Sequence, residues 1–434
     1  MRKNKVDIIT LGCSKNIVDS ERLMRQFQAN GFRVEHDPKK VNGEIVIVNT
    51  CGFIDEAKEE SLNILLELES AKQSNRIGKL FVMGCLSERF ATDLKKELPF
   101  VDRFYGKFNW KDVLQDVGKS YYADLSDERL LTTPKHYAWL KISEGCDRKC
   151  AYCSIPLMTG KYVSRPADEI VKEAQSLVKQ GVKEIQVIAQ DLTYYGIDLY
   201  RYAALPELIE RLADIDGLAW IRLHYGYPAN FPYNLLRVMR ERENVCKYLD
   251  IALQHISDRM LTKMRRNITG AETHDFIARI RAEVPGIHLR TTFMTGHPGE
   301  TDDDFEQLLE FVKEARFERM GAFVYSHEEG TYSYRHYSDD VPDSVKRQRL
   351  DRLMDIQQSI SAEVNEDKVG KTFRVMLDRC EGDYFIGRTE YDSPEIDPEV
   401  LIERKENHSS TIGDFCNATI VKADAFELYA EPVF

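Results

Sequence analysis

The stretch SEGCDRKCAYCSIP, residues 143–156, places Cys146, Cys150 and Cys153 in a C-x3-C-x2-C pattern. Three thiolates this close in sequence can each bind one iron of a cubic 4Fe-4S cluster, and the loop supplies no fourth ligand. One iron then stays open to a substrate. Structural zinc is the alternative, but it needs four Cys or His ligands, and the next cysteine, Cys246, is far along the chain.

The loop resembles that of the radical S-adenosylmethionine (SAM) family in its spacing and in the aromatic Tyr152 before the third cysteine. The resemblance implies that the open iron binds the amino and carboxylate groups of SAM. It also implies that the reduced cluster cleaves SAM to a 5′-deoxyadenosyl radical, and that Tyr152 lies against the adenine. The protein then contributes orientation and shielding, because the cofactor supplies the difficult chemistry.

Length and composition limit the kind of protein. A chain of 434 residues predicts about three domains, and no apolar stretch approaches the roughly 18 residues of a membrane helix. The first residues are typical of a strand and not of a signal peptide, and nine cysteines without disulfide-like spacing fit a reducing compartment. We therefore expect a cytoplasmic protein with no membrane partner. The net charge of −12 disfavours a general nucleic-acid binder.

A second set of cysteines lies in the first hundred residues, where strand-like and helix-like runs alternate. This alternation predicts a parallel α/β domain over residues 1–120. Three strand-like runs each end at a cysteine, namely Cys13, Cys51 and Cys85. The carboxyl ends of parallel strands meet at one edge, so we expect these cysteines to converge and hold a second cluster. The alternative is that they are simple buried thiols, since cysteine is among the commonest buried residues.

Residues 133–363 continue the alternation and predict a partial (β/α) barrel with its chemistry at the carboxyl ends of the strands. Polar residues in those strands are candidates for contacts with SAM or substrate, as is the Gly/Pro turn at residues 295–301. The predicted SAM contacts are Tyr152, Gln190, Gln254 and Arg290, with Asp191, His224 and His255 as further candidates. No catalytic residue is assigned beyond the cluster ligands.

Residues 365–434 change to five short strand-like runs, which predict a small antiparallel β-barrel of the TRAM or OB-like kind. Such modules commonly bind RNA, but this part carries 16 Asp and Glu against 8 Lys and Arg. That field repels phosphate and attracts a basic protein, with the acidic stretch at residues 392–399 as its densest part. Cys246, Cys380 and Cys416 are expected to be buried thiols.

The order of these three parts resembles the methylthiotransferases over essentially the whole chain, and LGCSKNIVDSE, NTCGFIDEA and GCL resemble the RimO-type branch. The resemblance implies that Cys13, Cys51 and Cys85 hold an auxiliary 4Fe-4S cluster that takes part in sulfur delivery. It further implies that one SAM gives the radical and a second donates the methyl group. The product would be a methylthio group on the β-carbon of an aspartate in ribosomal protein S-twelve of the small subunit.

Implied partners are the small ribosomal subunit and an electron donor such as flavodoxin or ferredoxin. Within this class, the alternative is a tRNA methylthiotransferase that acts on a modified adenosine, which a TRAM-like fold favours and the acidic charge disfavours. From another class, the alternatives are an iron-sulfur electron carrier or a zinc-binding RNA-interaction protein. An electron carrier has no use for an open iron or for a large barrel.

Overall fold

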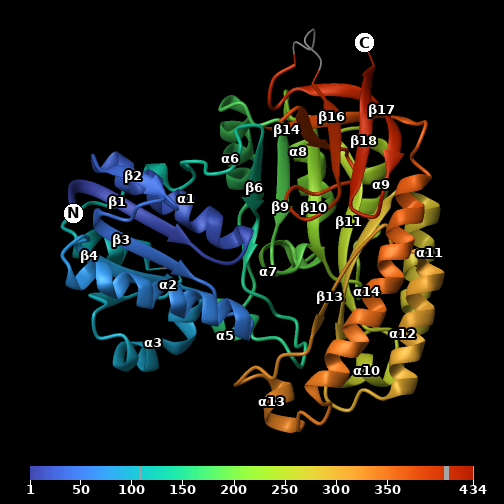
Figure 1. Ribbon diagram of the computed structural model, residues 1–434, viewed down its shortest axis with the longest axis horizontal. Helices are drawn as coiled ribbons and strands as arrows, with labels where there is room; N and C mark the ends of the chain where they lie inside the picture. Colours follow the sequence, from blue (N-terminus) through green and yellow to red (C-terminus); the bar gives the residue numbers. More distant parts are fainter. Residues whose placement is uncertain (108, 405–409, 434) are drawn as a thin grey trace. The chain divides into compact units, whose positions relative to one another are not determined.

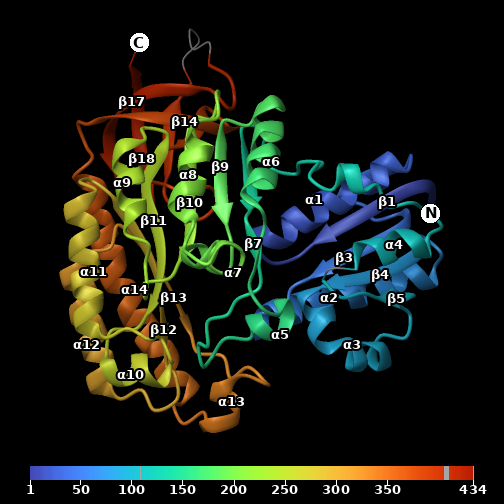
Figure 2. The same ribbon diagram turned by 180° about the vertical axis from the view of Figure 1, so that it is seen from behind.

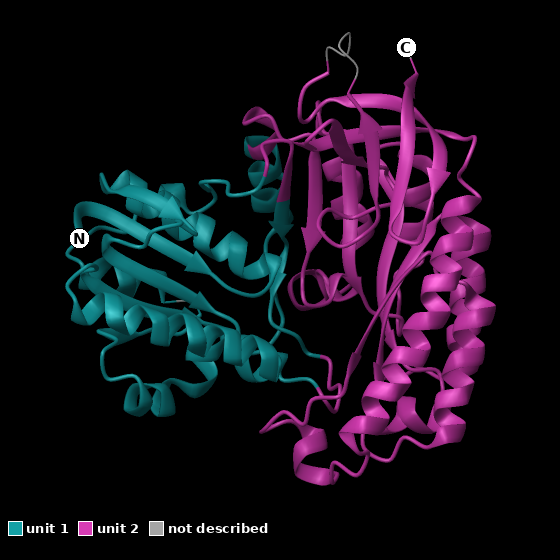
Figure 3. Cartoon of the chain, in the orientation of Figure 1, with its two compact units in different colours: residues 1–133, 139–147, 153–176 teal, residues 134–138, 148–152, 177–434 magenta. Residues whose placement is uncertain are grey.

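The computed structural model describes residues 1–107, 109–404 and 410–433. The chain divides into two compact units (Figure 3). Unit 1 consists of Met1–Thr133, Trp139–Asp147 and Cys153–Ser176, and unit 2 of Pro134–Ala138, Arg148–Tyr152 and Leu177–Phe434. The three domains expected at 1–120, 133–363 and 365–434 stay a prediction, and residues 405–409 and 434 of the last lie outside the described residues.

Unit 1 is built on a parallel sheet with the strand order β2-β1-β3-β4-β5 (Figure 1). Its strands are β1 (Arg2–Thr10), β2 (Arg33–His36), β3 (Gly43–Thr50), β4 (Lys79–Gly84) and β5 (Arg103–Phe104). The connecting helices are α1 (Ser14–Ala29), α2 (Asp55–Gln73), α3 (Cys85–Glu97) and α4 (Trp110–Asp116). The predicted parallel α/β architecture is confirmed.

The central strands of this sheet are apolar because both of their faces are covered. On one face, Val6 and Ile47 pack with Phe27 of α1 and Leu114 of α4. On the other face, side chains of α2 and α3 pack on the strands, and the cluster includes Val46, Val48, Leu65, Leu80 and Leu94. A sheet with two covered faces leaves its strand ends as the place where polar groups and ligands gather.

Unit 2 contains most of a second sheet, with the order β13-β12-β11-β10-β9-β6, and the pairings from β9 to β13 are parallel. Its strands are β6 (Tyr137–Lys141), β9 (Glu184–Ile188), β10 (Trp220–Gly226), β11 (Val245–Gln254), β12 (His288–Thr295) and β13 (Arg319–Val324). The main helices of unit 2 are α8 (Leu205–Ala213), α9 (Asn234–Glu241), α11 (Gly270–Glu283), α12 (Asp302–Ala315) and α14 (Asp343–Glu366), whereas most of α6 (Ala167–Lys179) belongs to unit 1. Figure 1 and Figure 2 show α8, α9, α11, α12 and α14 beside these strands. The predicted partial (β/α) barrel is confirmed.

The end of the chain forms a closed barrel with the order β14-β15-β16-β18-β17. These strands are β14 (Thr372–Glu381), β15 (Tyr384–Arg388), β16 (Glu399–Glu403), β17 (Phe415–Ala423) and β18 (Glu427–Val433). Four pairings are antiparallel, as expected, and β16 with β18 is parallel. A closed ring with an odd number of strands cannot alternate direction all the way round, so one parallel pair is required.

This C-terminal barrel lies at the amino ends of the sheet strands in unit 2 (Figure 1). Buried ion pairs join the two. Asp392 is 0% exposed and accepts from Arg319 at 2.6 Å, and Arg388 pairs with Glu184 at the start of β9. Both carboxylates are buried, and each is compensated by a guanidinium, so the two barrels are docked by paired charges.

The acidic stretch at residues 392–399 is therefore not the free docking surface that its composition predicts. Besides Asp392, Glu395 accepts from the Tyr137 hydroxyl at 2.8 Å, and Asp397 lies 3.6 Å from Arg290. Glu399 pairs with Arg379 within the barrel. The prediction is wrong for Asp392 and Asp397, because a run of carboxylates in sequence does not show which of them face arginines of another element, whereas Glu395 is exposed.

The other three cysteines differ in how exposed they are. Cys246 is buried, as expected, and Cys416 is partly buried. The prediction is wrong for Cys380, which is exposed near the end of β14, where the strand runs past the barrel core into the hairpin with β15. Among the described residues, none of the helices combines the length and the apolar character needed to cross a membrane.

Candidate metal centres

The three cysteines of the first hundred residues, Cys13, Cys51 and Cys85, lie where three neighbouring strands of unit 1 end. Cys13 precedes α1, Cys51 follows β3, and Cys85 is the first residue of α3 after β4. The loops approach one another closely: a Cβ added to Gly12 would lie 2.8 Å from the Cys51 sulfur. Gly12 also has a φ of 90°, so only glycine fits this position without strain. The strand ends therefore bring the first two cysteine loops into contact.

Side chains around the three thiols show the same convergence. Burial raises the pKa of Cys85 to about 12; the nearby Lys107 acts to lower it, while the charges of Cys13 and Cys51 raise it. Burial, together with the charge of Cys13, also raises the pKa of Cys51. The charges of Cys13 and Cys51 act on Cys85, so the three side chains lie near one another at this edge of the sheet, and their role as metal ligands stays a prediction.

Unit 1 also contains the two ends of the loop that carries Cys146, Cys150 and Cys153, and we call these paired ends its neck. That loop leaves β7 (Ser143–Glu144), passes through α5 (Ile155–Thr159) and returns along β8 (Val163–Ser164). The backbone N–H of Cys146 donates to the Gly160 carbonyl at 3.2 Å. A Cβ on Gly145 would lie 1.9 Å from the Lys161 carbonyl oxygen. The neck is therefore closed by backbone contact, and glycine is required there.

Past this neck, the Ser154 hydroxyl donates to the Phe53 carbonyl at 3.3 Å. Helix α5 also packs against α3, which begins at Cys85. The segment after Cys153 is thus held against the loops that follow Cys51 and Cys85. Unit 1 by itself accounts for this proximity.

The middle of the loop belongs to unit 2. There the Ala151 N–H donates to the Met264 carbonyl at 2.9 Å, after α10 (Asp258–Lys263), and the Ala151 carbonyl accepts from Ser333 at 2.7 Å, in α13 (Tyr332–His336). These two bonds fix the backbone between Cys150 and Tyr152. The Tyr152 ring makes an edge contact with His297, centroid to centroid 6.4 Å.

Three residues around Cys150 have no signal in the sequence. The Cys150 sulfur lies 3.2 Å from Arg266 Nη1 and 3.9 Å from the Tyr227 hydroxyl. Arg148 packs over the Tyr227 ring at 4.1 Å and pairs with Asp191 at 2.7 Å. Arg148 lies between Cys146 and Cys150 in the sequence, but its ion pair and its stacking depend on residues after strands β9 and β10, which the sequence pattern does not place.

In the described residues, no group of three or more His, Cys, Asp or Glu side chains is arranged to hold a metal ion. The role of the six cysteines as cluster ligands therefore stays a prediction, which rests on their donor chemistry and on their spacing in the sequence. Thiolates suit iron-sulfur clusters, and both sets are backed by close backbone contacts that leave the sulfurs on loops.

Two of the predicted SAM contacts have the character of ligand-binding residues. Gln254 ends β11 with a φ of 74°, and Gln190 follows β9. The side-chain oxygen of each is buried and has no hydrogen-bond donor in the described part of the chain. A buried acceptor without a donor is costly, and a non-glycine residue with positive φ is strained. Both features are typical of a site that a ligand completes.

The other strand-end candidates are engaged within the protein. Asp191 caps the turn after β9 by accepting from the Thr193 N–H at 2.9 Å, and His224 contacts Gln186 at 2.7 Å. His255 accepts from the N–H groups of the next two residues on Nδ1 and faces Glu300 with Nε2 at 3.2 Å. These contacts give the residues structural roles.

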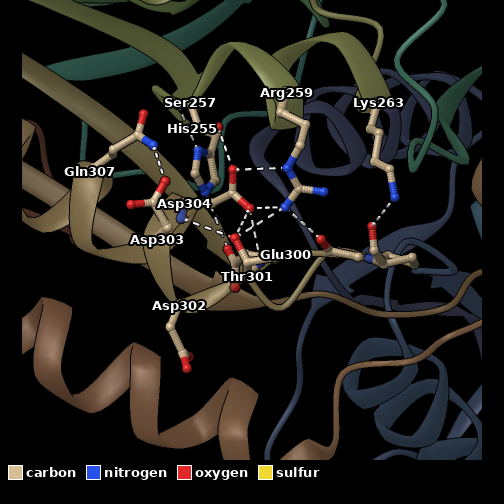
Figure 4. A network of polar contacts seen from close by, with 12 residues as sticks. His255, Ser257, Arg259, Lys263, Glu300, Thr301, Asp302, Asp303, Asp304 and Gln307 are labelled. Atoms are coloured by element: carbon tan, nitrogen blue, oxygen red, sulfur yellow. Dashed lines mark hydrogen bonds and ion pairs between the residues drawn. The ribbon is translucent and has the colours of Figure 1, made fainter.

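A polar network fixes the turn at residues 295–301 (Figure 4). Glu300 accepts from the Gly296 N–H at 2.7 Å and from Arg349 at 2.6 Å. Thr301 and Asp304 form a capping box at the start of α12, and Arg259 pairs with Asp304. The turn is therefore held rigidly after β12.

The expected placement of Arg290 at the carboxyl end of its strand is wrong. Arg290 is the third residue of β12, at the end near the C-terminal barrel, and it faces Asp250 at 3.5 Å and Asp397 at 3.6 Å. Its two carboxylate partners compensate the charge of this partly buried side chain. The alternation of strands and helices predicts the strand but not how far along it the arginine lies.

Comparisons with known proteins agree with this architecture. Residues 5–106 match the uncharacterized protein family UPF0004, residues 140–312 the radical SAM superfamily, and residues 369–433 the TRAM domain. The radical SAM methyltransferase TsrM from Kitasatospora setae superposes with a TM-score of 0.53 at 14% identity, covering 74% of this chain and 75% of that one. The barrel and its cysteine loop thus define a radical SAM protein.

The relatives are more specific. A protein of Parabacteroides distasonis named ribosomal protein uS12 methylthiotransferase RimO is 67% identical over 431 residues, which cover 99% of both chains. One of the same name from Phocaeicola vulgatus is 61% identical, again over 99% of both. The chain belongs to the RimO family of radical SAM methylthiotransferases and is a transferase.

Proposed function

We propose that this chain places a methylthio group on the β-carbon of an aspartate in ribosomal protein uS12. The relatives are named as methylthiotransferases of ribosomal protein uS12. The observation that carries the proposal is the convergence of Cys13, Cys51 and Cys85 at one edge of the unit 1 sheet. An enzyme that only cleaves SAM needs a single cluster, whereas sulfur insertion calls for a second thiolate set.

Each cysteine set has a proposed role. Cys146, Cys150 and Cys153 would hold the 4Fe-4S cluster that binds SAM. This group supplies the one-electron reductive cleavage of SAM when it is bound. Cys13, Cys51 and Cys85, in a domain we place at residues 1–120, would hold an auxiliary 4Fe-4S cluster for sulfur delivery.

The chain's own residues would bind and orient SAM. Tyr152 is held rigidly by the backbone bonds on Ala151, which fixes the direction of its ring. The unpaired oxygens of Gln190 and Gln254 are acceptors for the amino groups of SAM. Arg290 is not among the proposed SAM contacts because its guanidinium faces Asp250 and Asp397.

The acidic C-terminal barrel remains suited to a basic protein, through residues other than Asp392 and its neighbours. Exposed carboxylates on its strands and turns include Glu381, Asp383, Glu403 and Glu431. They would draw a basic ribosomal protein to the enzyme and repel phosphate. We place the reaction in the cytoplasm, where ribosomes are assembled, with a flavodoxin- or ferredoxin-like protein as electron donor.

The test is mass spectrometry of uS12 and of tRNA from cells that lack the chain, complemented with the wild type, Cys51→Ala, Cys150→Ala or Cys380→Ala. Wild type and the exposed-thiol control Cys380→Ala should restore the methylthio mass on uS12. Both other variants should fail to restore it. A methylthio group that appeared on a tRNA adenosine instead would assign the chain to tRNA modification.

A further inference from the structure

A buried arginine faces the middle cysteine of the loop in unit 2. Arg266 follows α10 and is 2% exposed. Its Nη1 lies 3.2 Å from the Cys150 sulfur and 3.3 Å from the Tyr152 hydroxyl. Its Nη2 donates to the Ala252 carbonyl in β11. The guanidinium is thus fixed between the cysteine loop and the sheet.

Within the described ranges, the charge of this guanidinium has no carboxylate partner. None of the described Asp or Glu side chains forms an ion pair with Arg266, and its Nε is buried without a hydrogen-bond acceptor. Arg148 is a useful contrast. It contacts the same Tyr227 ring, at 4.1 Å against 4.2 Å for Arg266, but it is paired with Asp191 at 2.7 Å.

A buried cation without a counter-charge destabilises a protein unless an anion compensates it. The sulfur of Cys150 lies within hydrogen-bond reach of Arg266, and a cysteine that binds metal does so as the anionic thiolate. Arginine suits this role because its fork stays charged and can donate to several acceptors at once. A buried positive charge is therefore placed beside one sulfur of the cysteine loop.

We propose that Arg266 is a positioning residue that raises the reduction potential of the cluster bound through Cys150. Hydrogen bonds to cluster sulfurs and the local charge set such potentials. Reduction adds one electron from an external donor, with no bond made or broken, and makes the cluster more negative. A fixed guanidinium at 3.2 Å stabilises that reduced state more than the oxidised one. This inference rests on the proposed role of Cys150 as a ligand.

The test is a redox titration of the anaerobically reconstituted full-length chain, followed by electron paramagnetic resonance. The signal that disappears in Cys150→Ala belongs to this cluster. In Arg266→Gln, we expect the ratio of reduced to oxidised cluster at a fixed potential to fall at least tenfold, which corresponds to about 59 mV for one electron. The matched control is Arg265→Gln, which removes a neighbouring arginine that stacks on Tyr332 at 4.5 Å, and its ratio should match the wild type.

Arg266→Lys keeps the charge and loses the fork, so we expect a smaller fall of about threefold. This variant also decides the question if Arg266→Gln does not retain iron. A wild-type ratio in Arg266→Gln with wild-type iron content, or in Arg266→Lys when the glutamine variant fails, would overturn the inference. If Cys150→Ala kept every signal and all of its iron, the assignment of Cys150 as a ligand would fail, and with it the proposed function.

Discussion

The two ends of the strands in the unit 2 sheet differ in how their polar groups are satisfied. At the amino ends, buried charges are paired: Arg319 with Asp392 and Arg388 with Glu184. At the carboxyl ends, the side-chain oxygens of Gln190 and Gln254 are buried without a donor among the described residues; near the amino ends, the Tyr248 hydroxyl and His288 Nδ1 are the comparable uncharged groups. A satisfied network stabilises the fold, whereas unsatisfied groups persist where a ligand completes them.

The difference teaches how one barrel separates stability from chemistry. The C-terminal barrel covers the amino ends. The charges buried there are ion-paired, and the pairing offsets their desolvation. The carboxyl ends keep strain and unpaired acceptors, of which the φ of 74° at Gln254 is an example. Substitutions at the two ends should therefore change different measured quantities.

The largest effect is expected at the carboxyl end. Cys150→Ala should abolish reductive formation of 5′-deoxyadenosine, because the loop then keeps only two of the three cysteines that the cluster needs. Chromatography of reaction mixtures with a strong chemical reductant measures it. Cys51→Ala should retain some of this SAM cleavage while losing methylthiolation. Equal loss of cleavage in both variants would contradict separate roles for the two sets.

At the amino end, Asp392→Ala should lower the free energy of unfolding by about 3–5 kcal/mol, since it leaves the Arg319 guanidinium buried without its partner. Urea denaturation measures the change. Replacement of both partners, Arg319→Met with Asp392→Leu, should recover much of the loss. The exposed-carboxylate control Glu381→Ala should stay within about 0.5 kcal/mol of the wild type. A wild-type stability for Asp392→Ala would show that this pair does not hold the two barrels together.

The same pair should make stability depend on pH. Burial alone would raise the pKa of Asp392, but Arg319 and Lys368 bring it well below the usual range. A carboxyl with a lowered folded pKa stabilises the protein above its unfolded pKa of about 4 and loses that contribution as pH falls further. Urea midpoints from pH 6 down to about pH 3 should therefore fall less steeply for Asp392→Asn than for the wild type. If the urea midpoints of the two proteins fell in parallel with pH, Asp392 would not contribute to the loss of stability in acid.

The smallest effects are expected from the unpaired amides. Gln190→Ala and Gln254→Ala should each weaken SAM binding by about 5- to 20-fold, the size of one or two lost hydrogen bonds. Stability should hardly change, because neither side-chain oxygen has a donor in the part of the chain that the structure describes. Calorimetric titration with SAM measures the first effect and urea denaturation the second. If the affinity for SAM were unchanged and the stability lower, these residues would have a structural role and not a role in SAM binding.

Much of the architecture could be predicted from local patterns. Alternating strands and helices indicate both parallel sheets, and the short strands after Gly370 indicate the terminal barrel. Three strand ends that carry cysteines predict a common edge, where the thiols of Cys51 and Cys85 do interact with Cys13. These features depend on spacing and periodicity, which the sequence contains directly.

The sequence by itself determined the cysteine loop, the strand-end cysteines and the class of each layer. Only the tertiary structure decided that Asp392 faces Arg319 and not a partner, and that Arg266 meets Cys150 from 116 residues away. The reason is physical. Propensity and periodicity act over a few residues, whereas the pairing of buried charges depends on which strand ends the folded chain brings within about 4 Å of each other.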